Sequence, residues 1–230
     1  MSIRLLSAAL GLLSLNCAAQ RQDAVDRVLE SLLRTDANTF WAHLVESRPT
    51  PVTAEFKGAA RRELPQKGEI TNLKRSAKQK LVGIEKILQM HGRKDAYDIM
   101  VIDGPDAFVG LYARSVVLIS LPALDHLNQE ELQAAIAHEA GHEYVWSEFE
   151  EARRRDDFDR LKELELLCDA VAVITLQRAG LNPHSMVSCF EALLQYARDR
   201  SGPHPNESRY IAPAARKTFI EKAISWARAK

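Results

Sequence analysis

Two histidines with a glutamate between them form an HExxH sequence at residues 138–142. If this segment is helical, His138 and His142 lie on one face, a turn apart, and can direct two ring nitrogens at one metal ion. Zinc accepts such nitrogens, and a catalytic zinc site keeps one coordination position open for water. Glu139 stands next to the first histidine, where its carboxylate can take a proton from that water. The sequence therefore predicts one Zn²⁺ per chain, with His138 and His142 as ligands and Glu139 as a general base.

The residues around the motif favour a helix. Asn128 and Glu131 have the spacing of a capping box, the pattern that begins many helices. Apolar residues then recur with a helical period at Leu132, Ala135 and Ile136. We therefore expect the two histidines within one amphipathic helix.

A second helix is expected at residues 161–179, because apolar residues recur along it and Gly180 and Pro183 follow it. Glu165 and Asp169 fall four residues apart on its apolar side. A carboxylate in that position is costly unless it is paired or bound to a metal. We assign Glu165 as the third zinc ligand and Asp169 as the acceptor for the outer N–H of a ligand histidine. The alternative for both acids is a place on the solvated edge of the helix.

The first residues are typical of an export signal. Arg4 precedes an apolar run at residues 5–15 that is too short to span a bilayer, and a Cys-Ala-Ala sequence at residues 17–19 offers a cleavage site. The first 19 residues are therefore predicted to be a signal peptide, and the mature protein to be periplasmic or secreted. Because Asn16 fits a bacterial lipobox poorly, we favour a soluble exported product over lipid anchoring at Cys17. No later stretch is long enough for a transmembrane helix.

The rest of the chain divides into two predicted parts. Apolar periodicity indicates an N-terminal helical region at residues 20–94, and the zinc-binding domain is expected at residues 95–230. Strands are expected at residues 97–102 and 116–119, with an irregular extended stretch at 106–112. Because these strands directly precede the metal helix, we predict a small antiparallel sheet packed on it. The predicted fold class is α+β and mostly helical.

Composition narrows the choice of partners. Lys+Arg and Asp+Glu both number 31, so no net field favours nucleic acid or an anionic membrane surface, and we expect no nucleic-acid partner. Cys168 and Cys189 are compatible with a disulfide after export and equally with two buried thiols. The oligomeric state stays open.

The motifs together resemble a family of zinc peptidases, the gluzincins of the HtpX type and the CAAX-prenyl endopeptidases. The similarity covers roughly residues 95–212. HExxH alone is shared by many zinc peptidases, whereas its combination with E-x-x-x-D and H-P-x-x-x-R is much more specific. Residues 108–124 are also similar to the antirepressor-type membrane metallopeptidases, so the subgroup stays open. The matching residues are Ile99–Asp103, Asp106-Ala107-Phe108, Val116–Ser120, His138–His142, Glu165, Asp169, His204, Pro205 and Arg209.

The resemblance implies a zincin-like fold and an endopeptidase that acts on polypeptides. It also implies that a substrate strand pairs with the edge around Asp106-Ala107-Phe108, although many members have Asn in place of Asp106 and many span the membrane. It implies that His204 lies in the catalytic site, either as a donor to the oxyanion or as an inhibitory ligand in zinc's open position. The alternative for His204 is a solvated loop residue. Arg209 and Tyr210 are further candidate oxyanion donors.

Two functions follow as hypotheses. The first is a zinc-dependent endopeptidase that hydrolyses exported or misfolded proteins. The alternative is a non-catalytic zinc-stabilised binding or chaperone module that holds unfolded exported proteins. Glu139 favours the enzyme, because a structural zinc site needs ligands, usually four from the protein, and no base.

Overall fold

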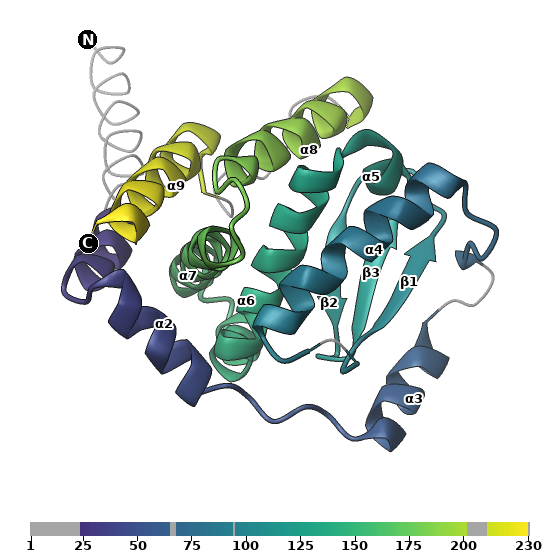
Figure 1. The fold of residues 1–230 in the computed structure, drawn as a ribbon, viewed down its shortest axis with the longest axis horizontal. Coiled ribbons are helices and arrows are strands. Elements are labelled where there is room, and N and C mark those ends of the chain that lie inside the picture. The colour runs from purple at the N-terminus through teal and green to yellow at the C-terminus, as the bar shows by residue number, and fades with distance from the viewer. Residues whose placement is uncertain (1–23, 65–67, 94, 202–210, 230) are drawn as a thin grey trace, which may run out of the picture.

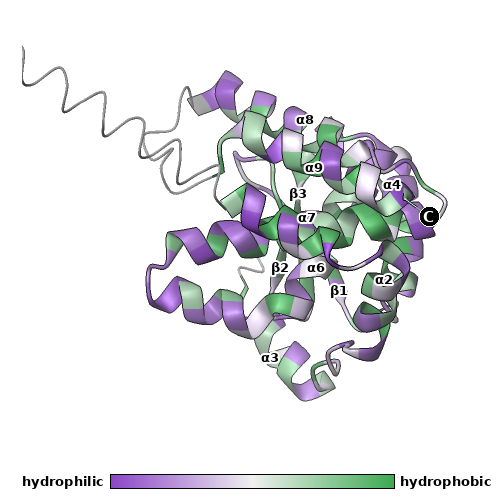
Figure 2. Ribbon diagram, turned by 90° about the vertical axis from the view of Figure 1, so that its left-hand side faces the viewer, coloured by the Kyte–Doolittle hydropathy of each residue, from purple (hydrophilic) through white to green (hydrophobic). Residues whose placement is uncertain are grey.

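The computed structural model describes residues 24–64, 68–93, 95–201 and 211–229. Helices predominate, and a three-stranded sheet lies to one side of two long central helices, α6 (Gln129–Arg154) and α7 (Phe158–Arg178) (Figure 1). The expected fold class, α+β and mostly helical, is confirmed. Figure 2 shows hydrophobic residues along α7 near the centre of the molecule and more hydrophilic residues on the outer helices.

The N-terminal part is helical, as predicted. Polar side chains begin two of its helices, since Asp36 and Thr53 accept hydrogen bonds from backbone N–H groups in the first turn. Its last helix packs against α6, and buried residues from Val25 to Ala227 form one core. The division of the chain between residues 94 and 95 stays a prediction. The helical segments here are residues 24–33, α2 (Ala37–Glu46), α3 (Ala54–Glu63) and α4 (Arg75–Met90).

The sheet consists of β1 (Asp98–Ile102), β2 (Val109–Tyr112) and β3 (Val116–Ser120), in the spatial order β1-β3-β2. β3 is antiparallel to β2 but parallel to β1, so the sheet is mixed and the prediction of an antiparallel sheet is corrected. Residues 103–108 carry the chain past the position that β3 later takes. Because β3 then returns antiparallel to β2, it runs parallel to β1. β3 is the most buried strand, which suits its central place.

The metal helix begins directly after the sheet. A short helix, α5 (Leu121–His126), is capped by Ser120, and the predicted capping box of Asn128 and Glu131 then starts α6. Both capping hydrogen bonds are present, at 3.0 Å and 2.8 Å. α6 therefore starts where the sequence predicts, nine residues before His138.

α7 runs beside α6 and is followed by α8 (Ser185–Ser201) and α9 (Pro213–Arg228). Gly180, with φ +68°, lies just past the end of α7, as expected of a helix C-terminus. Cys168 and Cys189 are buried free thiols in the structure. Among the described helices, none is both long enough and apolar enough to cross a membrane.

Candidate metal centre

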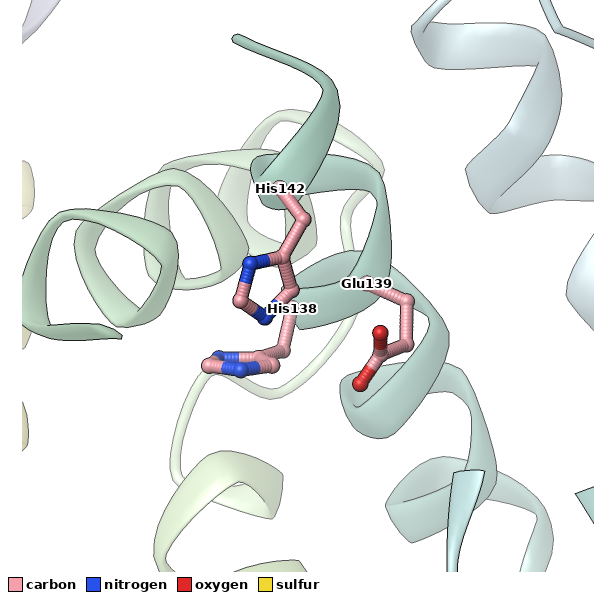
Figure 3. A group of neighbouring side chains, drawn as sticks. All are labelled: His138, Glu139 and His142. Atoms are coloured by element: carbon pink, nitrogen blue, oxygen red, sulfur yellow. The ribbon is translucent and has the colours of Figure 1, made fainter. Parts of the chain in front are cut away.

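The two histidines of the motif project from the same face of α6, and Glu139 lies beside them (Figure 3). The ring centroids of His138 and His142 are 5.0 Å apart. One potential ligand atom from each of His138, Glu139 and His142 can be chosen so that all three lie within 4.8 Å of one another. The helical period alone produces this arrangement, because four residues make slightly more than one turn.

α7 brings a carboxylate to both histidines. Oε2 of Glu165 lies 3.3 Å from Nε2 of His138, and Oε1 lies 3.7 Å from Nε2 of His142. Donor atoms held at about 2.0–2.2 Å by one tetrahedral zinc ion are roughly 3.2–3.6 Å apart. Two imidazole nitrogens and a carboxylate therefore fit a zinc ion in both chemistry and spacing.

The approach of α7 depends on a glycine. A Cβ at Gly141 would lie 2.9 Å from Cα of Cys168 and 3.1 Å from its carbonyl oxygen. Such contacts are shorter than side chains tolerate, so only a residue without Cβ fits at this crossing. The glycine between the two histidines thus lets α7 come close enough for Glu165 to reach them.

Asp169 holds the ring of His138. Its Oδ1 lies 2.8 Å from Nδ1 of His138, and its side chain is fully buried. With Nδ1 engaged in this way, Nε2 of the same ring faces Glu165. A carboxylate on the outer nitrogen fixes the orientation and tautomer of a ligand histidine, which is the role that the sequence analysis assigns to Asp169.

Arg216, from α9, is a member of this site that sequence reasoning missed. Its guanidinium donates two hydrogen bonds to Asp169, both at 2.8 Å, and its Nη2 lies 3.6 Å from Oε2 of Glu165. A signal was present in the sequence, since Arg216 lies three and four residues before the buried Phe219 and Ile220. A cation on the apolar side of a helix needs a buried partner.

The electrostatics of the site favour a bound cation. Burial lowers the pKa of His142 to about 4, with the nearby His138 as the next cause, so this ring is neutral and able to act as a ligand. For His138, burial acts to lower the pKa, but the carboxylates of Asp169 and Glu165 outweigh it and raise the pKa to about 10. The ring of His138 binds a proton firmly because it lies between two carboxylates. The same carboxylates create a negative potential, which also favours binding of a metal ion.

The acids respond to the same groups. Burial acts to raise the pKa of Glu165, but the hydrogen bond and charge of His138 bring it down to about 2. Burial likewise opposes ionisation of Asp169, and the charge of Arg216 with the hydrogen bonds from His138 and Arg216 lowers its pKa overall. Both carboxylates are therefore ionised at neutral pH.

Glu139 lies in a different environment. Burial raises its pKa to about 7, above the usual range for a carboxyl group. Its Oε2 accepts a hydrogen bond from the backbone N–H of Leu111 in β2, at 2.9 Å. A carboxyl group with a pKa near neutrality is suited to both accepting and returning a proton.

β2 is the edge strand of the sheet nearest to the metal helix, and within the described part of the chain it pairs with β3 alone. Phe108 directs its backbone carbonyl to the N–H of Ser120, at 3.0 Å. Because backbone groups alternate in direction along a strand, those of Val109 and Leu111 point away from β3. We call these outward backbone groups of Val109 and Leu111 the free edge of β2.

The other residues that the sequence analysis proposes for the site either precede β2 or lie outside the described residues. Asp106, Ala107 and Phe108 precede β2, and Phe108 is a partly exposed apolar side chain. Their part in substrate binding stays a prediction. His204, Arg209 and Tyr210 lie outside the described residues, as does the predicted signal peptide with Cys17.

Comparison with known families gives one match. The sequence model of Peptidase family M48 matches residues 73–145, from just before α4 to just beyond His142. No curated protein sequence matches the chain. The matched segment contains the HExxH residues, and the match supports a metallopeptidase of this family that uses zinc. The mostly helical fold with its small mixed sheet is zincin-like, as the peptidase domain of that family is.

Proposed function

We propose that this protein is a zinc-dependent endopeptidase that cleaves exported or misfolded polypeptides, with Glu139 as the general base. The observation that carries the proposal is the convergence of Glu165 from α7 on His138 and His142 of α6, beside a half-buried Glu139 that contacts the free edge of β2. A structural zinc site would need neither the base nor the adjacent strand edge.

His138, His142 and Glu165 would hold one zinc ion, and Asp169 with Arg216 would fix the first of these ligands. When bound, zinc supplies a coordinated water of lowered pKa and polarises the scissile carbonyl. Arg216 cancels part of the negative charge of Asp169 and Glu165, so the two carboxylates can be ionised together in a buried site.

Glu139 does the proton transfer in this scheme. Its carboxylate takes the proton of the attacking water and then returns it to the leaving amine. Burial acts to raise the pKa of Glu139 and so strengthens it as a base, whereas the charge of a bound zinc ion would act to lower it. A carboxylate with an ordinary pKa would be a weaker base and would take the proton from water less readily.

The free edge of β2 supports an extended polypeptide as the substrate. Main-chain hydrogen bonds to Val109 and Leu111 would bind backbone of almost any sequence, which suits unfolded substrates. The exposed ring of Phe108, next to this edge, offers an apolar contact for a substrate side chain. Export to the periplasm or beyond, and a place among the HtpX-type or CAAX-prenyl endopeptidases, are part of the proposal on the grounds given by the sequence.

Digestion of unstructured casein by the zinc-loaded protein tests the proposal. We expect cleavage that stops with a chelator and returns with zinc, and internal fragments that identify an endopeptidase. The matched control is Glu139→Gln, which keeps the metal ligands but removes the base. A protein that binds zinc and casein yet releases no fragments would instead be the non-catalytic binding module.

A further inference from the structure

The turn between β2 and β3 has an unusual backbone. Its two central residues, Ala113 and Arg114, have φ angles of +48° and +54°. A β-turn with both central residues in the left-handed region favours Asn or Gly there, because other residues are strained in that region. Neither residue here is of that type. Such strain persists where surrounding contacts hold the residue in place, and Arg114 makes those contacts.

The guanidinium of Arg114 reaches two other parts of the chain. Its Nη2 donates a hydrogen bond to the carbonyl oxygen of Thr50, at 2.9 Å. Its Nε faces Oε1 of Glu143 at 3.4 Å, and neither of these two buried atoms has a hydrogen-bond partner. The ion pair with Arg114 is thus a contact of Oε1 of Glu143 that links the turn to the metal helix.

Glu143 is a buried carboxylate on the metal helix, directly after His142. Its side chain is 3% exposed, and its other oxygen accepts a hydrogen bond from Arg93. Arg93, itself 2% exposed, also donates to the carbonyl of Pro49. Glu143 is thus paired with two arginines, with Arg93 inside the core and with the partly exposed Arg114 from the turn.

Arg114 and Leu111 together fix β2 against the metal helix at two points. Leu111 contacts Glu139, and Arg114, three residues later, contacts Glu143. The two glutamates are four residues apart, so they lie on one face of α6, a turn from each other. A substrate strand that pairs with the free edge would use the N–H of Leu111 and so remove the first contact. The pair of Arg114 with Glu143 would then be the contact that keeps the edge in place.

We propose that Arg114 is a positioning residue for substrate, which holds the free edge of β2 over Glu139 through its ion pair with Glu143. The inference rests on the proposed endopeptidase function. It assigns no chemical step to Arg114, whose effect reaches the substrate through the backbone of β2. Losing the pair should therefore weaken substrate binding and leave the metal site and the chemical step intact.

The test compares Arg114→Ala, Arg114→Lys and the wild type in the zinc-loaded protein. Both substitutions keep a Cβ, so the backbone preference of the turn is little changed. Arg153→Ala is the control, since Arg153 is an exposed arginine that pairs with Glu150 on the same helix. For a fluorogenic peptide, we expect Arg114→Ala to raise KM roughly tenfold, as loss of one charge-assisted contact would, with kcat within about twofold. Arg114→Lys should have a KM between those of the wild type and Arg114→Ala. Its ammonium can pair with Glu143 but cannot also donate a hydrogen bond to Thr50.

Amide hydrogen exchange gives a readout that does not depend on activity. We expect faster exchange at residues 109–112 in Arg114→Ala than in the wild type or Arg153→Ala, with equal zinc content. An unchanged KM in an active Arg114→Ala, or a fall in kcat alone, would overturn the inference while leaving the endopeptidase proposal standing. A wild type that cleaves no polypeptide would reject the endopeptidase proposal and with it the role toward substrate. If amide exchange at residues 109–112 were unchanged in Arg114→Ala, the inference that Arg114 keeps β2 in place would be rejected, whatever the activity.

Discussion

The backbone N–H of Leu111 donates a hydrogen bond to Oε2 of Glu139 across 2.9 Å, which joins the free edge of the sheet to the proposed base. In the proposed function, a substrate strand would compete with Glu139 for this donor. When backbone carbonyl of a substrate takes it, the carboxylate of Glu139 loses a partner and is free to turn toward water.

Glu139→Gln should abolish peptide hydrolysis and keep stoichiometric zinc, because the amide cannot accept a proton and the residue is not one of the three proposed ligands. Metal analysis by mass spectrometry and digestion of casein measure the two properties on one sample. Undiminished turnover, or loss of zinc from this variant, would remove Glu139 from its role.

Glu165→Ala should lose most zinc affinity, since it leaves two histidines to hold the ion. Glu163→Ala is the matched control two residues away on α7, where Glu163 pairs with Arg27 and Arg160 instead. Competition with a chromogenic chelator measures both affinities. Equal affinities in the two variants would show that α7 presents a different ligand.

Arg216→Met should weaken zinc binding roughly 10–100-fold, the usual effect of losing an outer partner of a ligand histidine. The methionine fills a similar volume but leaves Asp169 without its two hydrogen bonds from the guanidinium. The adjacent Lys217→Met, which breaks an exposed pair with Glu191, serves as the comparison. The same affinity in both variants would contradict the role of Arg216.

Gly141→Ala should destabilise the fold by about 1–3 kcal/mol, the usual cost of overpacking, and also weaken zinc binding. The new methyl group would meet the backbone of Cys168, which cannot move aside as a flexible side chain can. Gly104→Ala, where a Cβ meets nothing within 4 Å, is the control in urea unfolding. A stable Gly141→Ala with normal zinc affinity would show that α7 can shift without harm.

His91 should make the fold sensitive to acid. It is buried between the hydroxyls of Tyr144 and Thr175, and burial, with the charges of Arg48 and Arg93 as lesser causes, lowers its pKa to about 4. The unfolded chain takes up this proton near pH 6.5, so its contribution is full above that pH and is lost as the pH falls toward 4. Between these two pH values, the titration of His91 should lower the free energy of unfolding by roughly 3 kcal/mol in total.

The variant His91→Gln isolates this effect from the titration of the carboxylates. Urea unfolding at pH 7 and pH 4.5 should show that the wild type loses more free energy of unfolding than the variant does. Parallel losses in the two proteins would contradict the assignment to His91.

The local elements and the two helices of the metal centre could be predicted from the sequence. The capping box at Asn128 and the 3.6-residue period place the histidines on one face of α6, and the same period places Glu165 and Asp169 on the buried side of α7. These inferences use only neighbours in the chain. The zinc-like spacing of Glu165 and His138 then follows from packing two such faces together.

The features of the fold and site that were not predicted depend on contacts between residues far apart in the sequence, or on backbone groups. Arg216 forms hydrogen bonds with Asp169, which lies 47 residues earlier in the chain. The sequence pattern of α9 does not indicate which residue pairs with Arg216. The contact of Leu111 uses its N–H, a group that every residue except proline has, so no residue type signals it. The prediction of an antiparallel sheet was wrong for a similar reason, since the parallel pairing of β3 with β1 is a long-range property.

Arg216 lies on α9, C-terminal to every other element of the metal centre. α6 and α7 precede α9 along the chain and leave the ribosome first, whereas a domain generally folds as a unit. Nascent chains that end before α9 would therefore carry both histidines and Glu165 but leave Asp169 without its arginine. We expect such truncated chains to bind zinc weakly in an equilibrium titration. The metal site would thus be complete only once α9 has packed against α7.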